Sequence, residues 1–136
     1  MDLSLAADVH LPEDHAAAIA RVSAALKAEG FGVLTSIDMQ AAFREKLGAE
    51  FRPYTILGAC NPPLAFRAIS AESLVGLMLP CNVTVEAAAQ GGSVVRFINP
   101  DAMMGVGTLG ASPALAEVAA DATARLSRVA AALRGG

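Results

Sequence analysis

Tryptophan is absent from this 136-residue chain, tyrosine occurs once and phenylalanine five times. A core with so few aromatic rings must be built from aliphatic and small side chains, and 54% of the residues are apolar. Small side chains fill a core densely only where helices and sheet pack closely. The length is that of one domain and is sufficient to bury a core without disulfide bonds. We therefore expect a single domain over residues 1–136.

Clusters of lysine and arginine are also lacking, and the formal net charge is −3. Binding to nucleic acid requires a basic face for the phosphates, so we expect no nucleic-acid partner. No apolar run reaches the roughly 20 residues of a membrane-spanning helix, and the N-terminal residues lack the pattern of a signal peptide. We therefore expect a cytoplasmic protein that does not bind membranes.

Hydrophobic periodicity predicts an α+β chain. Pro12 suits a first helical turn, Gly30 a helix end, and Asp38 and Ser112 are good N-caps. Pro80 within a strand implies an edge position or a bulge. The predicted elements are a strand over 3–9, a helix over 12–29, a strand over 31–37, a short helix over 38–47, a strand over 53–60, a short helix after Asn61, strands over 75–85 and 93–98, and a long helix from Ser112.

This order predicts a two-layer sandwich: a largely antiparallel five-stranded sheet with two long helices on one face and short inserted helices. The strands over 75–85 and 93–98 are expected to form a hairpin. The second sheet face would then be uncovered, and a homodimer partner is the simplest cover. Met78 and Thr84 on that face would give it a mixed rather than an apolar character.

Cysteine is scarce as well, and the two thiols, Cys60 and Cys81, have similar neighbours in Cys60-Asn61-Pro62 and Pro80-Cys81-Asn82. Two cysteines are too few for a secreted disulfide framework. Asn61 as N-cap and Pro62 as first helical residue place Cys60 at a helix start. The helix dipole and free N–H groups there are expected to lower the thiol pKa from its ordinary value of about 8.5. The alternative is a thiol buried as a small apolar side chain.

Cys81 follows 21 residues later and returns beside Cys60 if the two strands are neighbours. A disulfide, a shared metal ion, or a nucleophile with a resolving thiol are then all possible. Because there is no C-x-x-C motif, zinc-finger and thioredoxin spacing is excluded. Two thiolates are an incomplete zinc site, whereas Met103 and Met104 can add thioethers around a cuprous ion.

Residues 105–110, GVGTLG, match the G-x-G-x-x-G pattern of dinucleotide-binding proteins. No parallel strand follows the next helix, as a Rossmann unit requires, so a flexible turn is the better interpretation. Such a turn over 103–110 can still cover a ligand beside the thiols.

Three segments, GFGVLTSIDM, KLGAEFRPYTILGACNPPLAFRAI and GLMLPCNVTV, resemble the family called domain of unknown function 302. The resemblance is specific over residues 30–85 and extends to Asp101. It implies a compact α/β fold similar to that of the TATA-binding protein, usually as a homodimer, with no assigned activity. It does not imply DNA binding, because a shared fold does not carry function. The matching positions are Asp38, Lys46, Tyr54, Gly58, Cys60, Asn61, Pro62, Cys81 and Asn82.

The sequence departs from the family at Phe66, where relatives often have histidine, and at Ser36, where many have an acidic residue. If that histidine were a third metal ligand, its loss would weaken a metal site here.

The leading hypothesis is a homodimeric module, centred on Cys60 and Cys81, that binds a small molecule or a soft metal such as copper or zinc, or responds to redox state. The ligand-binding or redox candidates are Cys60, Asn61, Pro62, Cys81, Asn82, Asp38, Lys46 and Tyr54, and the metal candidates are Cys60 and Cys81. One alternative is a thiol enzyme with Cys60 as its nucleophile. The other is a structural or interaction domain with both cysteines in the core.

Overall fold

Five antiparallel strands form one sheet, in the order β1-β5-β4-β3-β2, in this computed structural model, which describes residues 6–135. The strands are β1 (Ala6–Leu11), β2 (Gly32–Asp38), β3 (Tyr54–Cys60), β4 (Cys81–Ala87) and β5 (Ser93–Ile98). The α+β class, the antiparallel sheet and the β4–β5 hairpin are confirmed. Residues 3–5 of the predicted first strand lie outside the described residues.

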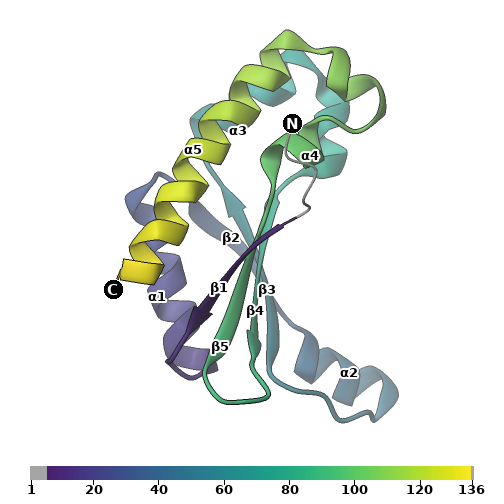
Figure 1. The fold of residues 1–136 in the computed structure, drawn as a ribbon. Coiled ribbons are helices and arrows are strands. Elements are labelled where there is room, and N and C mark those ends of the chain that lie inside the picture. Colours follow the sequence, from purple (N-terminus) through teal and green to yellow (C-terminus); the bar gives the residue numbers. More distant parts are fainter. Residues whose placement is uncertain (1–5, 136) are drawn as a thin grey trace.

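Two long helices, α1 (His15–Ala28) and α5 (Pro113–Gly135), lie along one face of the sheet (Figure 1). Asp14 caps α1 by accepting a hydrogen bond from the Ala17 N–H at 3.0 Å, and Gly30 ends it with a φ of 86°. Ser112 caps α5 through the Leu115 N–H. The core between the two layers is aliphatic and includes Val9, Val22, Leu26, Leu57, Val83, Val95, Leu126 and Val129. The predicted two-layer arrangement is therefore confirmed.

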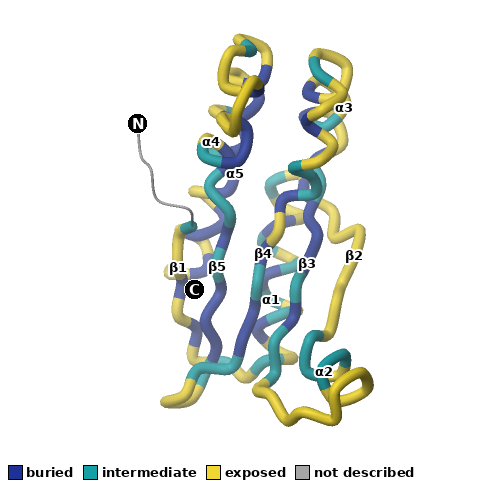
Figure 2. The backbone as a smooth tube through the Cα atoms, turned by 90° about the vertical axis from the view of Figure 1, so that its right-hand side faces the viewer, coloured by how far each residue is buried: buried dark blue, intermediate teal, exposed yellow. Residues whose placement is uncertain are grey.

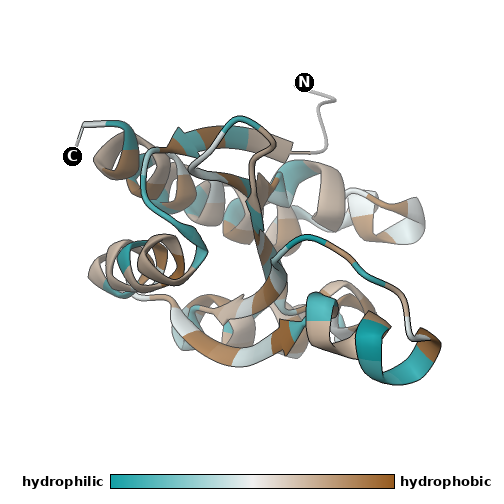
Figure 3. Ribbon diagram, turned by 90° about the horizontal axis from the view of Figure 1, so that it is seen from below, coloured by the Kyte–Doolittle hydropathy of each residue, from teal (hydrophilic) through white to brown (hydrophobic). Residues whose placement is uncertain are grey.

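Shorter helices extend the molecule at both ends of the sheet. They are α2 (Met39–Leu47), α3 (Pro62–Ala71), η1 (Ser73–Met78), α4 (Pro100–Met104) and η2 (Gly107–Ala111), where η marks a 3₁₀-helix. Asp38 caps α2, which projects from the rest of the molecule and carries hydrophilic segments (Figure 3). At the opposite end, α3, η1, α4 and the first turns of α5 enclose a second apolar cluster that includes Leu64, Val75, Cys81, Met103, Met104 and Leu115.

The predicted strand over 75–85 is wrong in its first half, because residues 73–78 form η1 and the strand begins at Cys81. Glu72 caps η1 by accepting a hydrogen bond from the Leu74 N–H at 3.1 Å. Pro80 has no N–H for a sheet ladder, so the strand cannot extend back through it. Met78 therefore lies in η1 and not on the sheet, whereas Cys81 begins the alternation of buried side chains predicted for β4.

Figure 2 looks onto the second face of the sheet. This face carries a network of charged side chains. Glu86 accepts hydrogen bonds from Arg52 and Arg96, and Arg96 also pairs with Asp8 at 3.5 Å. Burial acts to raise the pKa of Glu86, but the hydrogen bonds and charges of the two arginines lower it below its ordinary value. This polar network allows the face to contact water, so the homodimer expected from an uncovered sheet stays a prediction.

The helices within residues 6–135 include none with the length and hydropathy needed to cross a membrane.

Candidate functional site

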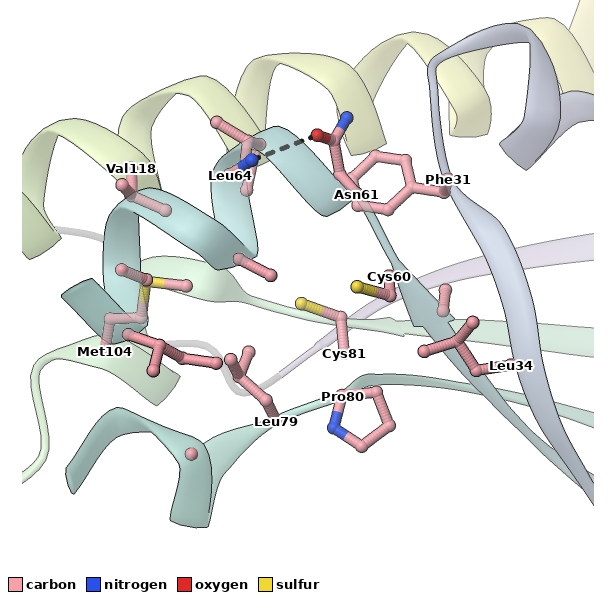
Figure 4. A pocket seen from close by; sticks show the side chains of 16 residues that line it. Phe31, Leu34, Cys60, Asn61, Leu64, Leu79, Pro80, Cys81, Met104 and Val118 are labelled. Atoms are coloured by element: carbon pink, nitrogen blue, oxygen red, sulfur yellow. Dashed lines mark hydrogen bonds between the residues drawn. The ribbon is translucent and has the colours of Figure 1, made fainter. Parts of the chain in front are cut away.

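A cavity of about 290 Å³ lies at the end of the sheet where α3 and η1 extend beyond the strands (Figure 4). Of its sixteen lining residues, only Cys60, Asn61 and Cys81 have polar side chains, and none is charged. The apolar lining consists of Phe31, Leu34, Ala59, Leu64, Ala65, Ala68, Ile69, Gly76, Leu79, Pro80, Met104, Val118 and Ala122. The cavity therefore favours apolar contents.

Neighbouring strands carry the two cysteines to this cavity. Cys60 is the last residue of β3 and Cys81 the first of β4, and Ala59 faces Cys81 across the ladder. Both thiols are free; Cys81 is buried and Cys60 is partly exposed. In Figure 4 the two side chains project in the same direction from their strands. The predicted strands of the two cysteines are thus neighbours, and Cys60 lies one residue along the chain from the partner of Cys81.

Both polar side-chain atoms of Asn61 make structural hydrogen bonds. Its Oδ1 accepts from the Leu64 N–H at 3.2 Å, which confirms the predicted N-cap of α3. Its Nδ2 donates to the Glu29 carbonyl at 3.4 Å, which ties α3 to the end of α1. A Cβ at Gly30 would lie 2.8 Å from Nδ2, so a glycine is required there for this contact. Asn61 therefore positions the cavity wall, and its orientation is set by these two bonds.

The expected lowering of the Cys60 pKa is wrong, because burial raises the pKa of this thiol. Burial, and to a smaller extent the charge of Cys60, raises the pKa of Cys81 to about 11. The start of α3 explains why no anion is stabilised there. Pro62 and Pro63 have no N–H, and the next N–H, of Leu64, is bonded to Asn61. The helix thus begins without the free donors that stabilise a thiolate.

The donors for a metal ion at this site are few. Within residues 6–135 no group of three or more His, Cys, Asp or Glu side chains could hold a metal. Met104 lines the cavity with both cysteines, whereas Met103 is buried in the adjacent cluster without lining it. The available set is therefore two thiols and one thioether, which is short of a four-coordinate zinc site. Copper binding by this set stays a prediction.

Three of the candidate residues lie far from the cysteines. Tyr54 and Cys60 are the two ends of β3, and six residues of strand span roughly 20 Å. Asp38 pairs with Thr55 at the Tyr54 end and caps α2, which also carries Lys46. Tyr54 contacts the ring of Phe51 at a centroid distance of 6.3 Å. The structure therefore separates Asp38, Lys46 and Tyr54 from the cavity.

The remaining candidates adjoin the cavity without lining it. Pro62 is exposed in the first turn of α3, and Asn82 is exposed on β4 opposite Gly58. Phe66 is 75% exposed and does not line the cavity, so its difference from the histidine of relatives does not alter the lining. Residues 107–110 of the predicted flexible turn belong to η2 (Gly107–Ala111), and Leu109 packs in the second apolar cluster.

Most of the apolar wall was not found by sequence reasoning. The sequence predicts the short helix after Asn61, but not that its Leu64, Ala65, Ala68 and Ile69 form one side of a cavity. Phe31, Leu34 and Val118 come from elements far away in the sequence. The only available signal was the run of small residues on α3, and a run of alanines is equally typical of close packing.

Comparisons with known proteins agree on one family. The model of Domain of unknown function DUF302 matches residues 7–133, well beyond the segment whose resemblance was recognised from its motifs. A crystal structure of an uncharacterized conserved protein DUF302 from Bacillus stearothermophilus is 33% identical, with a TM-score of 0.84. The match covers 96% of this chain and 98% of that chain. Among curated proteins no match is found.

Proposed function

This chain belongs to the DUF302 family, and we propose that it binds a small, neutral, apolar molecule in the cavity beside Cys60 and Cys81. The observation that carries the proposal is the lining, in which three of sixteen side chains are polar and none is charged. A charged ligand would lose its hydration without gaining a partner, which is costly. An apolar ligand gains from leaving water.

The size of the cavity limits the ligand. A volume of about 290 Å³ is close to the lower end of ordinary ligand pockets, roughly 300 Å³. An apolar cavity of about 150 Å³ is known to hold benzene. A mono- or bicyclic aromatic compound, or a short aliphatic chain, is therefore the class of ligand that fits. The thiols contribute polarisable contacts to it rather than charge.

The thiol enzyme is the less well supported alternative. A thiol with a pKa of about 11, such as Cys81, is ionised in about one molecule in ten thousand at pH 7. Cys60 is also shifted toward the neutral thiol. The structural alternative has one observation in its favour, since Cys81 belongs to the second apolar cluster. It differs from the proposal in predicting no saturable ligand.

The exposed edge of the sheet supports a homodimer. All seven residues of β2 are exposed, and within residues 6–135 this strand pairs only with β3. Unpaired edges of this kind tend to join another strand. Antiparallel pairing of two β2 strands centred on Thr35 would place Val33 opposite Ile37 of the partner subunit. In this pairing no two residues of like charge face each other. Leu34 belongs to both β2 and the cavity lining, so the dimer would border the cavity.

Titration with indole tests the ligand proposal directly. The protein has no tryptophan, so the emission of indole can be followed without that background. With reduced protein we expect saturable binding of one indole per chain and a shift of its emission to shorter wavelength. The heat-capacity change should be negative because apolar surface is buried.

A matched pair of variants locates the binding. Ala65→Leu adds three carbons at a lining position of α3, and Ala71→Leu makes the same change at an exposed position of that helix outside the lining. We expect Ala65→Leu to weaken indole binding about tenfold or more and Ala71→Leu to leave it unchanged. Folded wild-type protein that binds no indole, or equal binding by both variants, would contradict the proposal.

A further inference from the structure

Cys60 and Cys81 lie within the separation that a disulfide requires. Cys60 is offset by one residue from the Ala59–Cys81 pair. With strands about 4.8 Å apart and a rise of about 3.3 Å per residue, their Cα atoms are roughly 6 Å apart. Cα atoms joined by a disulfide are about 4.4–6.8 Å apart. The two side chains project in the same direction (Figure 4).

The chain from Cys60 to Cys81 forms most of the cavity wall. It comprises α3 and η1, and ten of the sixteen lining residues lie from Cys60 to Cys81. Because this segment supplies these residues, its movement would change the shape and the opening of the cavity. The two ends of this segment are Cys60 and Cys81, so a disulfide between them would hold both ends of this part of the cavity wall together.

We propose that Cys60 and Cys81 form a reversible disulfide by exchange with a low-molecular-weight disulfide, and that this bond holds the α3–η1 segment closed over the cavity. The Cα separation stands on the strand register. A regular ladder would place Cys60 on the sheet face opposite Ala59 and Cys81, so the shared direction of the two thiols at the strand ends stands on Figure 4 and on the cavity that both line. Its effect on ligand exchange rests on the proposed function.

The exchange has two balanced steps. The Cys60 thiol, which is the more exposed, loses its proton and attacks a sulfur of the small disulfide, so that a mixed disulfide forms and one thiolate leaves. The Cys81 thiol then loses its proton and attacks the Cys60 sulfur, and the second thiolate leaves. The two protons end on the two released thiols. The protein is oxidised by two electrons, and the small disulfide is reduced to two thiols.

The uncharged cavity favours a disulfide over a stable thiolate or a cuprous site. The dithiol and the disulfide are both neutral, so neither leaves a charge among the apolar side chains. A thiolate, or a cuprous ion held by two thiolates, would leave a net negative charge there at a desolvation cost. Since burial raises the pKa of both thiols, the exchange should accelerate as pH rises.

Equilibration in glutathione buffers, followed by acid quenching and intact mass spectrometry, tests the bond. We expect oxidised wild-type protein to lose two hydrogens and to carry no glutathione at equilibrium. Cys60→Ser and Cys81→Ser each keep one thiol and should yield only mixed disulfides. The proposal of a Cys60–Cys81 disulfide is overturned if folded wild-type protein stays reduced in oxidised glutathione, or if it accumulates only glutathione adducts or disulfide-linked dimers.

Hydrogen exchange tests the closing of the wall without any ligand. Amides of α3 and η1 should exchange at least about fivefold more slowly in the oxidised protein, whereas those of α2, at the other end of the sheet, should not change. Unchanged exchange in α3 and η1 would overturn the closing role. Indole should also bind and leave at least about fivefold more slowly. If the bond forms and protects α3 but indole binds neither form, the disulfide stands and the proposed function fails.

Discussion

Gly58 lies so close to Thr35 that a Cβ atom at residue 58 would come within 2.2 Å of the Thr35 hydroxyl oxygen. It would also approach the Cγ of Pro80 to 2.8 Å. Gly58 is thus the point where β2 and the residue before β4 both meet β3. Since Pro80 lines the cavity, the close approach at Gly58 helps to set the cavity wall.

We predict that Gly58→Ala destabilises the protein by about 2–3 kcal/mol, because overpacking costs about 1–3 kcal/mol and two neighbours must move here. Gly32→Ala on β2 is the matched control, since a Cβ there would have no atom within 4 Å. Urea unfolding measures both free energies of unfolding. A Gly58→Ala variant as stable as Gly32→Ala would show that the contact relaxes without cost.

The network around Glu86 predicts a dependence of stability on acid pH. The Glu86 pKa is lowered in the folded protein, so the carboxylate contributes stability above its unfolded pKa of about 4.3. This contribution is lost as pH falls from that value through the folded pKa. Glu86→Gln should therefore be less stable than wild type at pH 7, and the difference should shrink below about pH 4. Thermal unfolding of both proteins from pH 3 to pH 7 measures it, with exposed Glu45→Gln as control. A constant difference across that range would contradict the role of the Glu86 charge.

The backbone near the cysteines could be predicted from sequence because its signals are local. Asn61 before Pro62 marks a helix start, and the alternation from Cys81 marks a strand, and both are confirmed. The predicted strand began too early, because residues 75–78 fit a strand by composition but form part of a 3₁₀-helix that Glu72 caps.

The electrostatics of the site could not be predicted from the same local signals. A helix start favours an anion only if its N–H groups are free, and the N–H of Leu64 is bound to the very side chain that marks the start. Burial of the thiols depends on residues as remote as Met104 and Val118, which no spacing rule connects to Cys60. The family positions Asp38 and Tyr54 likewise share a sequence signature with Cys60 and lie at the other end of the sheet.

The proposed dimer predicts that a charge on β2 separates the subunits. Val33→Lys places an ammonium group on the outer strand, opposite Ile37 of the partner subunit in the pairing centred on Thr35. We expect wild-type protein to sediment as a dimer and Val33→Lys as a folded monomer. Leu47→Lys, a change at an exposed residue of α2, should leave the dimer intact. A wild-type protein that is monomeric at high concentration, or a Val33→Lys dimer, would exclude pairing through β2.

The raised thiol pKa values predict slow alkylation that accelerates with pH. In Cys60→Ser, which reports on Cys81 alone, the rate with iodoacetamide should rise about tenfold per pH unit and reach no plateau below about pH 10, because only the thiolate reacts. The pKa of Cys81 in wild type is about 11, and removing the charge of Cys60 should lower it somewhat. In Cys81→Ser, the more exposed Cys60 should react faster at every pH, also with a midpoint above its ordinary value. A Cys60 midpoint near or below pH 7 would contradict the neutral cavity and favour the thiol enzyme, because it would require a thiolate stabilised at the start of α3.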